Sequence, residues 1–200
     1  MQLVLASRSP QRRALLSQLA MPFRVEVSGY EEELTDGRPR YTVAENARGK
    51  AEDVRAGRRL PPHELVLGVD TVVVVDGAVL GKAGDEAEAR AYLRRLAGRT
   101  HEVYSGLHLC SATRGVTVTA VTKVTFRELS DAALAGYVAC GEWRERAGAY
   151  AIQGIGSALV TGVEGDYFNV VGLPVAALLE ALEEFGVPPF SWLQENGGTS

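Results

Sequence analysis

The apolar pattern at the start of the chain predicts a strand, a turn and a helix. Residues 3–6 form a short apolar run of the kind found in buried strands, and Ser7-Arg8-Ser9-Pro10 follows it. Leucines then recur at helical spacing over residues 15–19. Ser9 is expected to cap this helix and Pro10 to occupy its first turn, where a missing N–H costs nothing. Residues 23–28 alternate like a half-buried strand.

The longest apolar segment lies in the middle of the chain. Residues 65–75 form a nearly continuous aliphatic run, which predicts a strand buried on both faces. Asp76-Gly77 is typical of a two-residue hairpin turn and leads into a second strand at 79–80. Upstream, Thr42-Val43-Ala44-Glu45 has the spacing of a capping box, so we expect a helix to start there and to run towards Gly57.

Strands and helices alternate in the second half as well. Asp85 is expected to open a helix that Gly98 closes, and Ser130 to cap another that ends near Gly141. Between them, residues 101–127 alternate on both sides of a turn and predict an antiparallel hairpin.

The remaining elements complete the expected fold. Two short strands are predicted around Gly165, a last helix from Pro174, and a loosely held segment after Val187. The order of elements predicts an α/β fold with a mixed twisted sheet and helices on both faces. We expect a single domain over residues 1–187 and a C-terminal tail over residues 188–200.

Composition and charge exclude several classes of protein. Hydrophobic residues make up 46% of the 200 positions and charged residues 23%, which is ordinary for a globular domain. The net charge of −4 leaves no global basic field to hold a nucleic acid backbone. An anionic ligand must therefore be bound locally, and we expect no nucleic acid partner.

The cellular location is predicted from the absence of a signal-peptide core and of a membrane-spanning run in the sequence. Cys110 and Cys140 do not have a metal-type spacing, and the first apolar residues run directly into Arg8 without the apolar core of a signal peptide. The run at 65–75 is far shorter than the roughly 20 residues needed to cross a bilayer. We expect a cytoplasmic protein without a membrane partner.

The first turn is a candidate anion site. The end of a strand followed by a helix N-terminus at Ser7-Arg8-Ser9-Pro10 presents free backbone N–H groups and hydroxyls. Arg12 and Arg13 lie within the first helical turn and would add positive charge. The alternative is an ordinary serine-capped helix with solvated arginines.

Asp70 is the most informative single residue. It interrupts an aliphatic strand, where an unpaired carboxylate would be strongly penalised. A metal ion, a lysine or a network of hydrogen bonds could compensate its charge, and Gly68 would let a ligand approach closely. The alternative is a carboxylate satisfied by nearby backbone.

Acidic and basic residues elsewhere could complete a site. Glu31-Glu32-Glu33 could supply oxygen ligands for magnesium beside phosphates, or could be a solvated loop. Only three of the 21 basic residues are lysine, at positions 50, 82 and 123. Lys50 and Lys82 could neutralise a phosphate chain, with ordinary surface lysines as the alternative.

Together these residues are the parts that metal-assisted cleavage of a phosphoanhydride requires. A metal would polarise the attacked phosphorus, a carboxylate would orient or deprotonate water, and cations would stabilise the leaving pyrophosphate. The sequence has neither a Walker-type phosphate loop nor a Gly-x-Ser-x-Gly nucleophile motif.

Six segments of the chain form an ordered set of motifs over about residues 3 to 185. They are Leu5-Ala6-Ser7-Arg8-Ser9-Pro10, Asn46-Ala47-x-x-Lys50-Ala51, Gly68-Val69-Asp70-Thr71, Leu80-Gly81-Lys82, the segment 148–154 (GAYAIQG) and the segment 165–174 (GDYFNVVGLP). In this order they resemble the successive motifs of the Maf family of nucleotide pyrophosphatases. Each motif alone would be weak evidence, but a chance match of all six in this order is improbable.

The resemblance implies a two-lobed fold, similar to that of inosine triphosphate pyrophosphatases, with the site in the cleft. It implies hydrolysis of nucleoside triphosphates to monophosphate and pyrophosphate and dependence on a divalent metal such as Mg²⁺ or Mn²⁺. Homodimers are frequent in this family. The matching positions make Asp70, Glu32 and Lys82 catalytic candidates, with Glu32 and Asp70 as metal ligands. Substrate binding would fall to Ser7, Arg12, Arg13, Lys50 and Gln153.

The segment around Gln153 resembles the branch of the family that acts on dTTP and UTP, whereas another branch acts on methylated guanine nucleotides. A glutamine amide has a donor and an acceptor, which suits the carbonyl and N–H edge of uracil or thymine. The alternative is a glutamine that satisfies loop backbone.

Two positions depart from the family pattern. Gln11 stands where the family usually has the first of two arginines, with Arg13 as a candidate substitute, and Ala83 stands where a proline is common.

Three other functions compete with this hypothesis. An inosine-triphosphate-type purine pyrophosphatase would use the same chemistry with another base pocket. A nucleotide-binding regulator of cell division would bind without turnover. A nucleic-acid-binding module is disfavoured by the acidic charge balance.

Overall fold

The computed structural model describes residues 1–35, 37–57 and 59–195. Within these residues, seven strands form one mixed sheet with the order β2-β1-β3-β5-β6-β7, and β4 pairs with β3 off this path. The strands are β1 (Gln2–Leu5), β2 (Phe23–Val25), β3 (Glu64–Val75), β4 (Ala78–Leu80), β5 (Thr100–Cys110), β6 (Gly115–Phe126) and β7 (Val160–Glu164).

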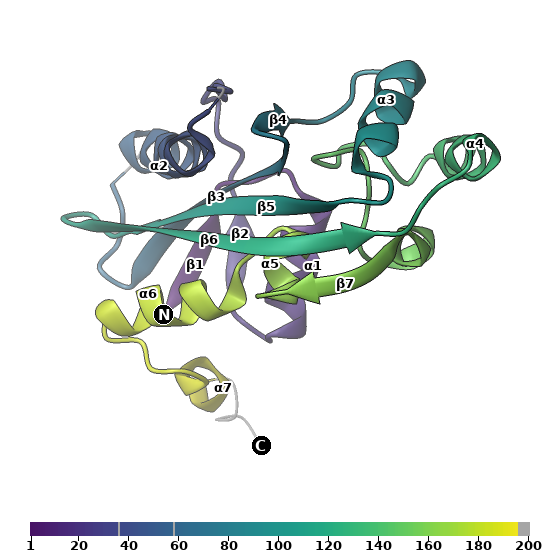
Figure 1. Ribbon diagram of the computed structural model, residues 1–200. Coiled ribbons are helices and arrows are strands. Elements are labelled where there is room, and N and C mark those ends of the chain that lie inside the picture. Colours follow the sequence, from purple (N-terminus) through teal and green to yellow (C-terminus); the bar gives the residue numbers. More distant parts are fainter. Residues whose placement is uncertain (36, 58, 196–200) are drawn as a thin grey trace.

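Helices connect and cover these strands (Figure 1). They are α1 (Pro10–Gln18), α2 (Pro39–Ala56), α3 (Glu86–Leu96), α4 (Asp131–Cys140), the 3₁₀ helix η1 (Gly154–Leu159), α5 (Tyr167–Val171), α6 (Val175–Glu184) and α7 (Ser191–Glu195).

Strand β3 organises the sheet because it pairs with different strands along its length. Its first residues pair in parallel with β1 as far as Leu67, and its last residues pair with β4 from Val73 onwards. β5 runs antiparallel along the other edge of β3 over nearly its whole length. The short stretch between β1 and β4 is therefore an open edge of β3, and Asp70 and Thr71 lie on it.

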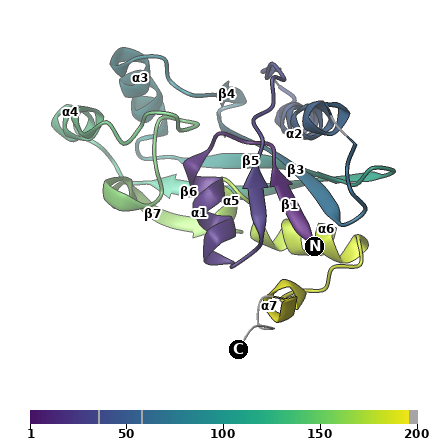
Figure 2. The same cartoon turned by 180° about the vertical axis from the view of Figure 1, so that it is seen from behind.

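Helix α2 lies against one face of the sheet, and α5 and α6 lie against the opposite face (Figures 1 and 2). Two glycines in neighbouring strands, Gly68 and Gly106, allow this close approach. A Cβ on Gly68 would overlap the carbonyl of Ala47, and one on Gly106 would overlap the carbonyl of Val43. The backbone of α2 thus rests almost directly on β3 and β5.

The predicted arrangement of strands and helices is largely confirmed. Ser9, Asp85 and Ser130 each accept a backbone hydrogen bond as N-caps of α1, α3 and α4. β3 is buried along almost all of its length, as expected for a central strand covered on both faces. The hairpins at Asp76-Gly77 and around residues 111–114 also form.

The predicted start of α2 at Thr42 is wrong. The helix begins at Pro39, whose fixed φ suits the first turn, so Thr42 lies inside it. The Thr42 hydroxyl instead bonds to the backbone of Thr35, with distances of 3.3 Å from Oγ1 to both the amide nitrogen and the carbonyl oxygen. It fastens the incoming loop to the helix.

The segment around Gly165 also differs from the prediction. Among the described residues, strand β7 ends directly before this glycine, and helix α5 follows it in place of the second predicted strand. Asp166 caps α5 by accepting a hydrogen bond from the amide of Phe168 at 2.8 Å. An aspartate directly before an apolar segment favours a helix start over a second strand.

The segment after Val187 is held more firmly than expected. Trp192 in α7 is 1% exposed, and its indole Nε1 donates to the carbonyl of Leu19 at 2.9 Å. Burial of a large aromatic side chain anchors α7 beside the end of α1. The division into a domain over 1–187 and a tail stays a prediction, and residues 196–200 lie outside the described part.

No helix in the described residues is long and apolar enough to span a membrane.

The close contact of α2 with β3 can be tested by Gly68→Ala. We expect the free energy of unfolding to fall by about 1–3 kcal/mol, because the new methyl group overlaps the Ala47 carbonyl and must displace α2. Gly136→Ala in α4 is the matched control, since a Cβ there meets open space and should stabilise the helix by up to about 1 kcal/mol. Urea unfolding measures both, and equal effects would contradict the packing argument.

Candidate active site

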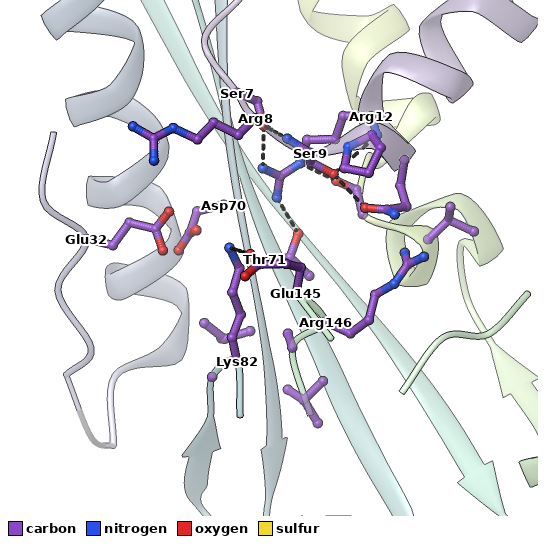
Figure 3. Close-up of a pocket in the computed structure, with 18 of the residues that line it drawn as sticks. Ser7, Arg8, Ser9, Arg12, Glu32, Asp70, Thr71, Lys82, Glu145 and Arg146 are labelled. Carbon is purple, nitrogen blue, oxygen red and sulfur yellow. Dashed lines mark hydrogen bonds and ion pairs between the residues drawn. The ribbon is translucent and has the colours of Figure 1, made fainter. Parts of the chain in front are cut away.

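A cavity of about 860 Å³ opens where β3 separates from β1. Its walls come from the turn after β1, the loop before α2, the open edge of β3, and the segment around residues 145–153. In sheets of this kind, ligands bind in the crevice beyond the carboxyl ends of the strands. The cavity therefore lies where the topology favours a ligand (Figure 3).

Asp70 lies at the inner wall of this cavity and is 5% exposed. Lys50 of α2 approaches it, with 2.8 Å between Nζ and Oδ1. Asn46, one turn earlier on α2, donates to Oδ2 at 2.9 Å. The partners that the buried carboxylate required are thus a lysine and an amide on one face of the same helix.

These partners determine the charge state of Asp70. Burial alone would raise the pKa of its carboxyl group, but Lys50, the amide of Asn46 and the more distant Arg12 together hold this pKa below its ordinary value. Asp70 is consequently ionised throughout the neutral range in the absence of a ligand.

Glu32 reaches the same lysine from the loop before α2. Its Oε1 lies 2.7 Å from Lys50 Nζ, and its side chain is 46% exposed. Asn46 holds this loop, because its amide donates to the carbonyl of Glu33 at 2.9 Å and accepts from the Glu33 N–H at 3.0 Å. Figure 3 shows the carboxylates of Glu32 and Asp70 pointing towards one another.

This pair of carboxylates fits a divalent cation. Two hard oxygen donors on one cavity wall match the way Mg²⁺ is usually held, by one or two carboxylates together with water and substrate phosphates. Glu32 and Asp70 are the residues that would hold such an ion here.

Arg12 of α1 forms the adjoining wall and is 9% exposed. Its Nε donates to the carbonyl of Gly172 at 2.8 Å, Nη1 to Ser7 Oγ at 3.1 Å, and Nη2 to Thr71 Oγ1 at 3.2 Å. Burial lowers the pKa of Arg12, against the opposing effect of Asp70 and Glu32. The guanidinium group is fixed on three sides beside the carboxylates.

Lys82 lies across the cavity, just after β4. Its side chain is 57% exposed, and its Nζ lies 2.9 Å from Oε2 of Glu145. An ion pair this exposed contributes little to stability. Lys82 can therefore leave Glu145 and bind another anion with little loss of free energy.

Arg146 lines the cavity next to Glu145. The Gln11 amide is oriented so that both its nitrogen and its oxygen form hydrogen bonds. The amide nitrogen donates to Ser9 Oγ at 2.9 Å. Its oxygen then accepts from Nη2 and Nη1 of Arg146, at 2.8 and 2.9 Å. Among the described residues, no carboxylate lies within ion-pair distance of Arg146. Burial lowers the pKa of its guanidinium group, and the more distant Tyr137 and Glu142 oppose this effect.

The structure gathers most of the predicted site residues around this cavity. Its lining includes Ser7, Arg12, Glu32, Lys50, Asp70, Lys82 and Gln153. Gln153 is exposed at the start of η1 and makes no capping bond with its side chain. Arg13 is exposed and lies outside the residues that line the cavity.

Three contributors were not predicted from the sequence. Asn46 could have been found, because it precedes Lys50 by one helical turn, and so could Thr71, which follows Asp70 as a hydroxyl in an aliphatic strand. Arg146 stands among other charged residues of a loop, and no local pattern distinguishes it from a solvated arginine.

The sequence is similar to that of known proteins over most of its length. The model of the Maf-like protein family matches residues 2–185. A protein of Koribacter versatilis named dTTP/UTP pyrophosphatase is 46% identical over 94% of this chain and 96% of its own length. One of the same name from Moorella thermoacetica is 48% identical, over 92% and 95%.

The fold also resembles a solved structure. The Ham1 protein of Staphylococcus aureus matches with a TM-score of 0.56 and 14% identity, covering 93% of this chain and 100% of that one. This likeness, together with the seven-stranded mixed sheet, confirms the expected mixed α/β fold. The family match over most of the chain, together with relatives above 40% identity, establishes that this protein belongs to the family of Maf-like proteins.

Proposed function

We propose that this protein hydrolyses nucleoside triphosphates to the monophosphate and pyrophosphate, with dTTP and UTP as preferred substrates. The observation that carries the proposal is the buried Asp70, paired with Lys50 and facing Glu32, in a cavity with several cations on its walls. The names of the relatives, dTTP/UTP pyrophosphatase, support the same activity.

The cations of the cavity would bind the triphosphate. Lys50 lies beside the carboxylates, and Arg12, Lys82 and Arg146 also line the cavity. The amide groups at the start of α1, next to Ser7, add hydrogen-bond donors and the positive end of a helix dipole. Charge neutralisation by several fixed donors is the main requirement for cleaving a phosphoanhydride.

Glu32 and Asp70 would hold a divalent cation, Mg²⁺ or Mn²⁺. Such an ion supplies Lewis acidity at the attacked phosphate and lowers the pKa of bound water.

Asp70 would orient the attacking water and accept its proton. Without substrate, Lys50 holds the pKa of Asp70 low, which makes the carboxylate a weak base. Substrate phosphates compete for Lys50, so binding would weaken the Lys50–Asp70 pair and leave the carboxylate of Asp70 available to the ion and to the attacking water. Water then attacks the α-phosphorus, the bond to the bridging oxygen breaks, and pyrophosphate leaves towards Lys82 and Arg146.

Gln153 would select the base. Its exposed amide at the cavity rim can donate to a pyrimidine carbonyl and accept from the ring N–H of uracil or thymine. Modified pyrimidine nucleotides that keep this edge would also be substrates.

The activity is tested by pyrophosphate release from a panel of nucleoside triphosphates, with Mg²⁺, Mn²⁺ or a chelator. We expect metal-dependent turnover of dTTP and UTP in the wild type and a loss of about 100-fold or more in Asp70→Asn, because the general base is removed. Nucleotide binding without turnover under every condition would instead support a regulatory protein, and preference for inosine triphosphate would support a purine pyrophosphatase.

The role of Gln153 is tested by Gln153→Leu. We expect kcat/KM for dTTP and UTP to fall by about 10- to 100-fold, because the polar edge of the base loses its partners. Turnover of purine triphosphates should stay within a few-fold of the wild type, and the melting temperature should not change, since the residue is exposed. An equal loss for all bases would rule out base selection by Gln153.

Arg146 and Arg13 provide a matched pair of variants. Arg146→Gln should raise KM by about 10-fold or more, because it removes charge-assisted hydrogen bonds to the phosphates. Arg13→Gln should leave KM unchanged, since Arg13 does not line the cavity. Steady-state kinetics with dTTP distinguish the two variants. The reverse result would show that Arg13 takes the role of the arginine that Gln11 replaces.

A further inference from the structure

A cluster of three potential metal ligands lies outside the cavity, between α2 and the end of β5. Glu52 Oε, His108 Nε2 and Cys110 Sγ all lie within 4.8 Å of one another. His108 Nε2 and Glu52 Oε1 lie 3.5 Å apart. A tetrahedral zinc ion sets nitrogen and oxygen ligands roughly 3.3 Å apart, so small side-chain rotations would complete the geometry.

The imidazole of His108 is oriented for coordination. The residue is 4% exposed, and its Nε2 is buried without a hydrogen-bond partner. Its other ring nitrogen, Nδ1, lies 2.7 Å from Thr117 Oγ1 on the neighbouring strand. A metal-bound histidine usually donates this second N–H to a nearby oxygen, which leaves the first nitrogen unprotonated and directed at the ion.

The backbone also makes room for the cluster. His108 and Cys110 are two residues apart on β5 and therefore project from the same face, towards α2. At the start of β6, Gly115 has no side chain, and a Cβ there would lie 2.7 Å from His108 Nε2. Any larger residue at this position would push the ring out of its present place.

The charged groups around the cluster leave one oxygen of Glu52 available. Arg55 pairs with Oε2 and donates to the carbonyl of Ala112 at 3.2 Å, so Oε1 is directed towards His108. Arg48 is the other nearby cation, and it pairs with Glu45. Carboxylate ligands are commonly held through their second oxygen in this way.

We propose that Glu52, His108 and Cys110 form a binding site for Zn²⁺, separate from the candidate active site. A thiolate, an imidazole and a carboxylate are the ligand types that zinc takes, with water in the fourth position. Mg²⁺ prefers oxygen ligands only, so this site and the Glu32–Asp70 pair would select different ions. Binding transfers the Cys110 thiol proton to solvent, and no redox change is involved.

The site would join α2 to β5. None of its three residues lines the cavity, but Glu52 follows Lys50 on the same helix. An ion that binds only the folded chain stabilises it by mass action. We therefore expect zinc to raise the melting temperature of the wild-type protein.

Cobalt(II) is the direct probe, because a cobalt–thiolate bond absorbs in the near ultraviolet and an oxygen-bound cobalt ion does not. Full-length protein is treated with chelator, exchanged into clean buffer and titrated with Co²⁺. We expect a thiolate charge-transfer band that saturates at one ion per chain and that Zn²⁺ abolishes. The absence of this band in the folded wild type would overturn the proposal.

The second cysteine supplies the matched control. Cys140 is free and exposed, whereas Cys110 is free and buried, so Cys140→Ser should keep the band and Cys110→Ser should lose it together with the thermal shift by zinc. Glu52→Gln changes a partly exposed position and should leave the fold intact, so it tests the site if Cys110→Ser misfolds. It should weaken Co²⁺ affinity by about 10-fold or more. A band that persists in Cys110→Ser, or unchanged affinity in Glu52→Gln, would contradict the site.

Discussion

The candidate active site depends on one buried ion pair, between Asp70 on β3 and Lys50 on α2. Each charge alone would be costly in an aliphatic environment, and removing one partner of a buried pair typically costs about 3–5 kcal/mol. The pair is satisfied further by Asn46 and by the carbonyl of Val69, which accepts from Lys50 Nζ at 3.2 Å. The middle of α2 and the open edge of β3 are therefore fixed to one another by charge as well as by packing.

The charges of the cavity are arranged for a ligand that is more negative than the residues it displaces. Lys50 is shared between two carboxylates, Lys82 is paired with an exposed one, and Arg146 is held only by a neutral amide. A triphosphate can replace these carboxylates without leaving a cation unpaired. The same cations offer an uncharged ligand no ion pair.

Much of the fold could be predicted from the sequence because its signals are local. Helix caps, the Asp-Gly turn and the aliphatic run of β3 each act within a few residues. A lone carboxylate in such a run predicts that a partner exists, although it does not predict which residue that partner is. At the start of α2, the sequence contains two possible helix starts, the capping-box spacing at Thr42 and the proline at Pro39. The helix begins at Pro39. After Gly165, Asp166 started a helix where a strand was expected.

The remaining features depend on contacts between distant segments, which periodicity does not reveal. Arg146 is placed at the cavity beside Gln11, and Trp192 packs in the core and donates to the carbonyl of Leu19. Glu52 meets His108 only because α2 lies across β5. Sequence motifs located the candidate site, but its electrostatics and the second cluster required the packing of α2 on the sheet.

The pair of glycines beneath α2 has a consequence for how this protein can diverge. Because the helix rests on main-chain atoms of β3 and β5, the separation between Lys50 and Asp70 is set by backbone contact and not by the sizes of intervening side chains. Substitutions elsewhere in the core can then be absorbed by local repacking without changing that separation. The geometry of the site therefore tolerates substitutions elsewhere in the core, whereas any side chain at Gly68 or Gly106 would displace α2.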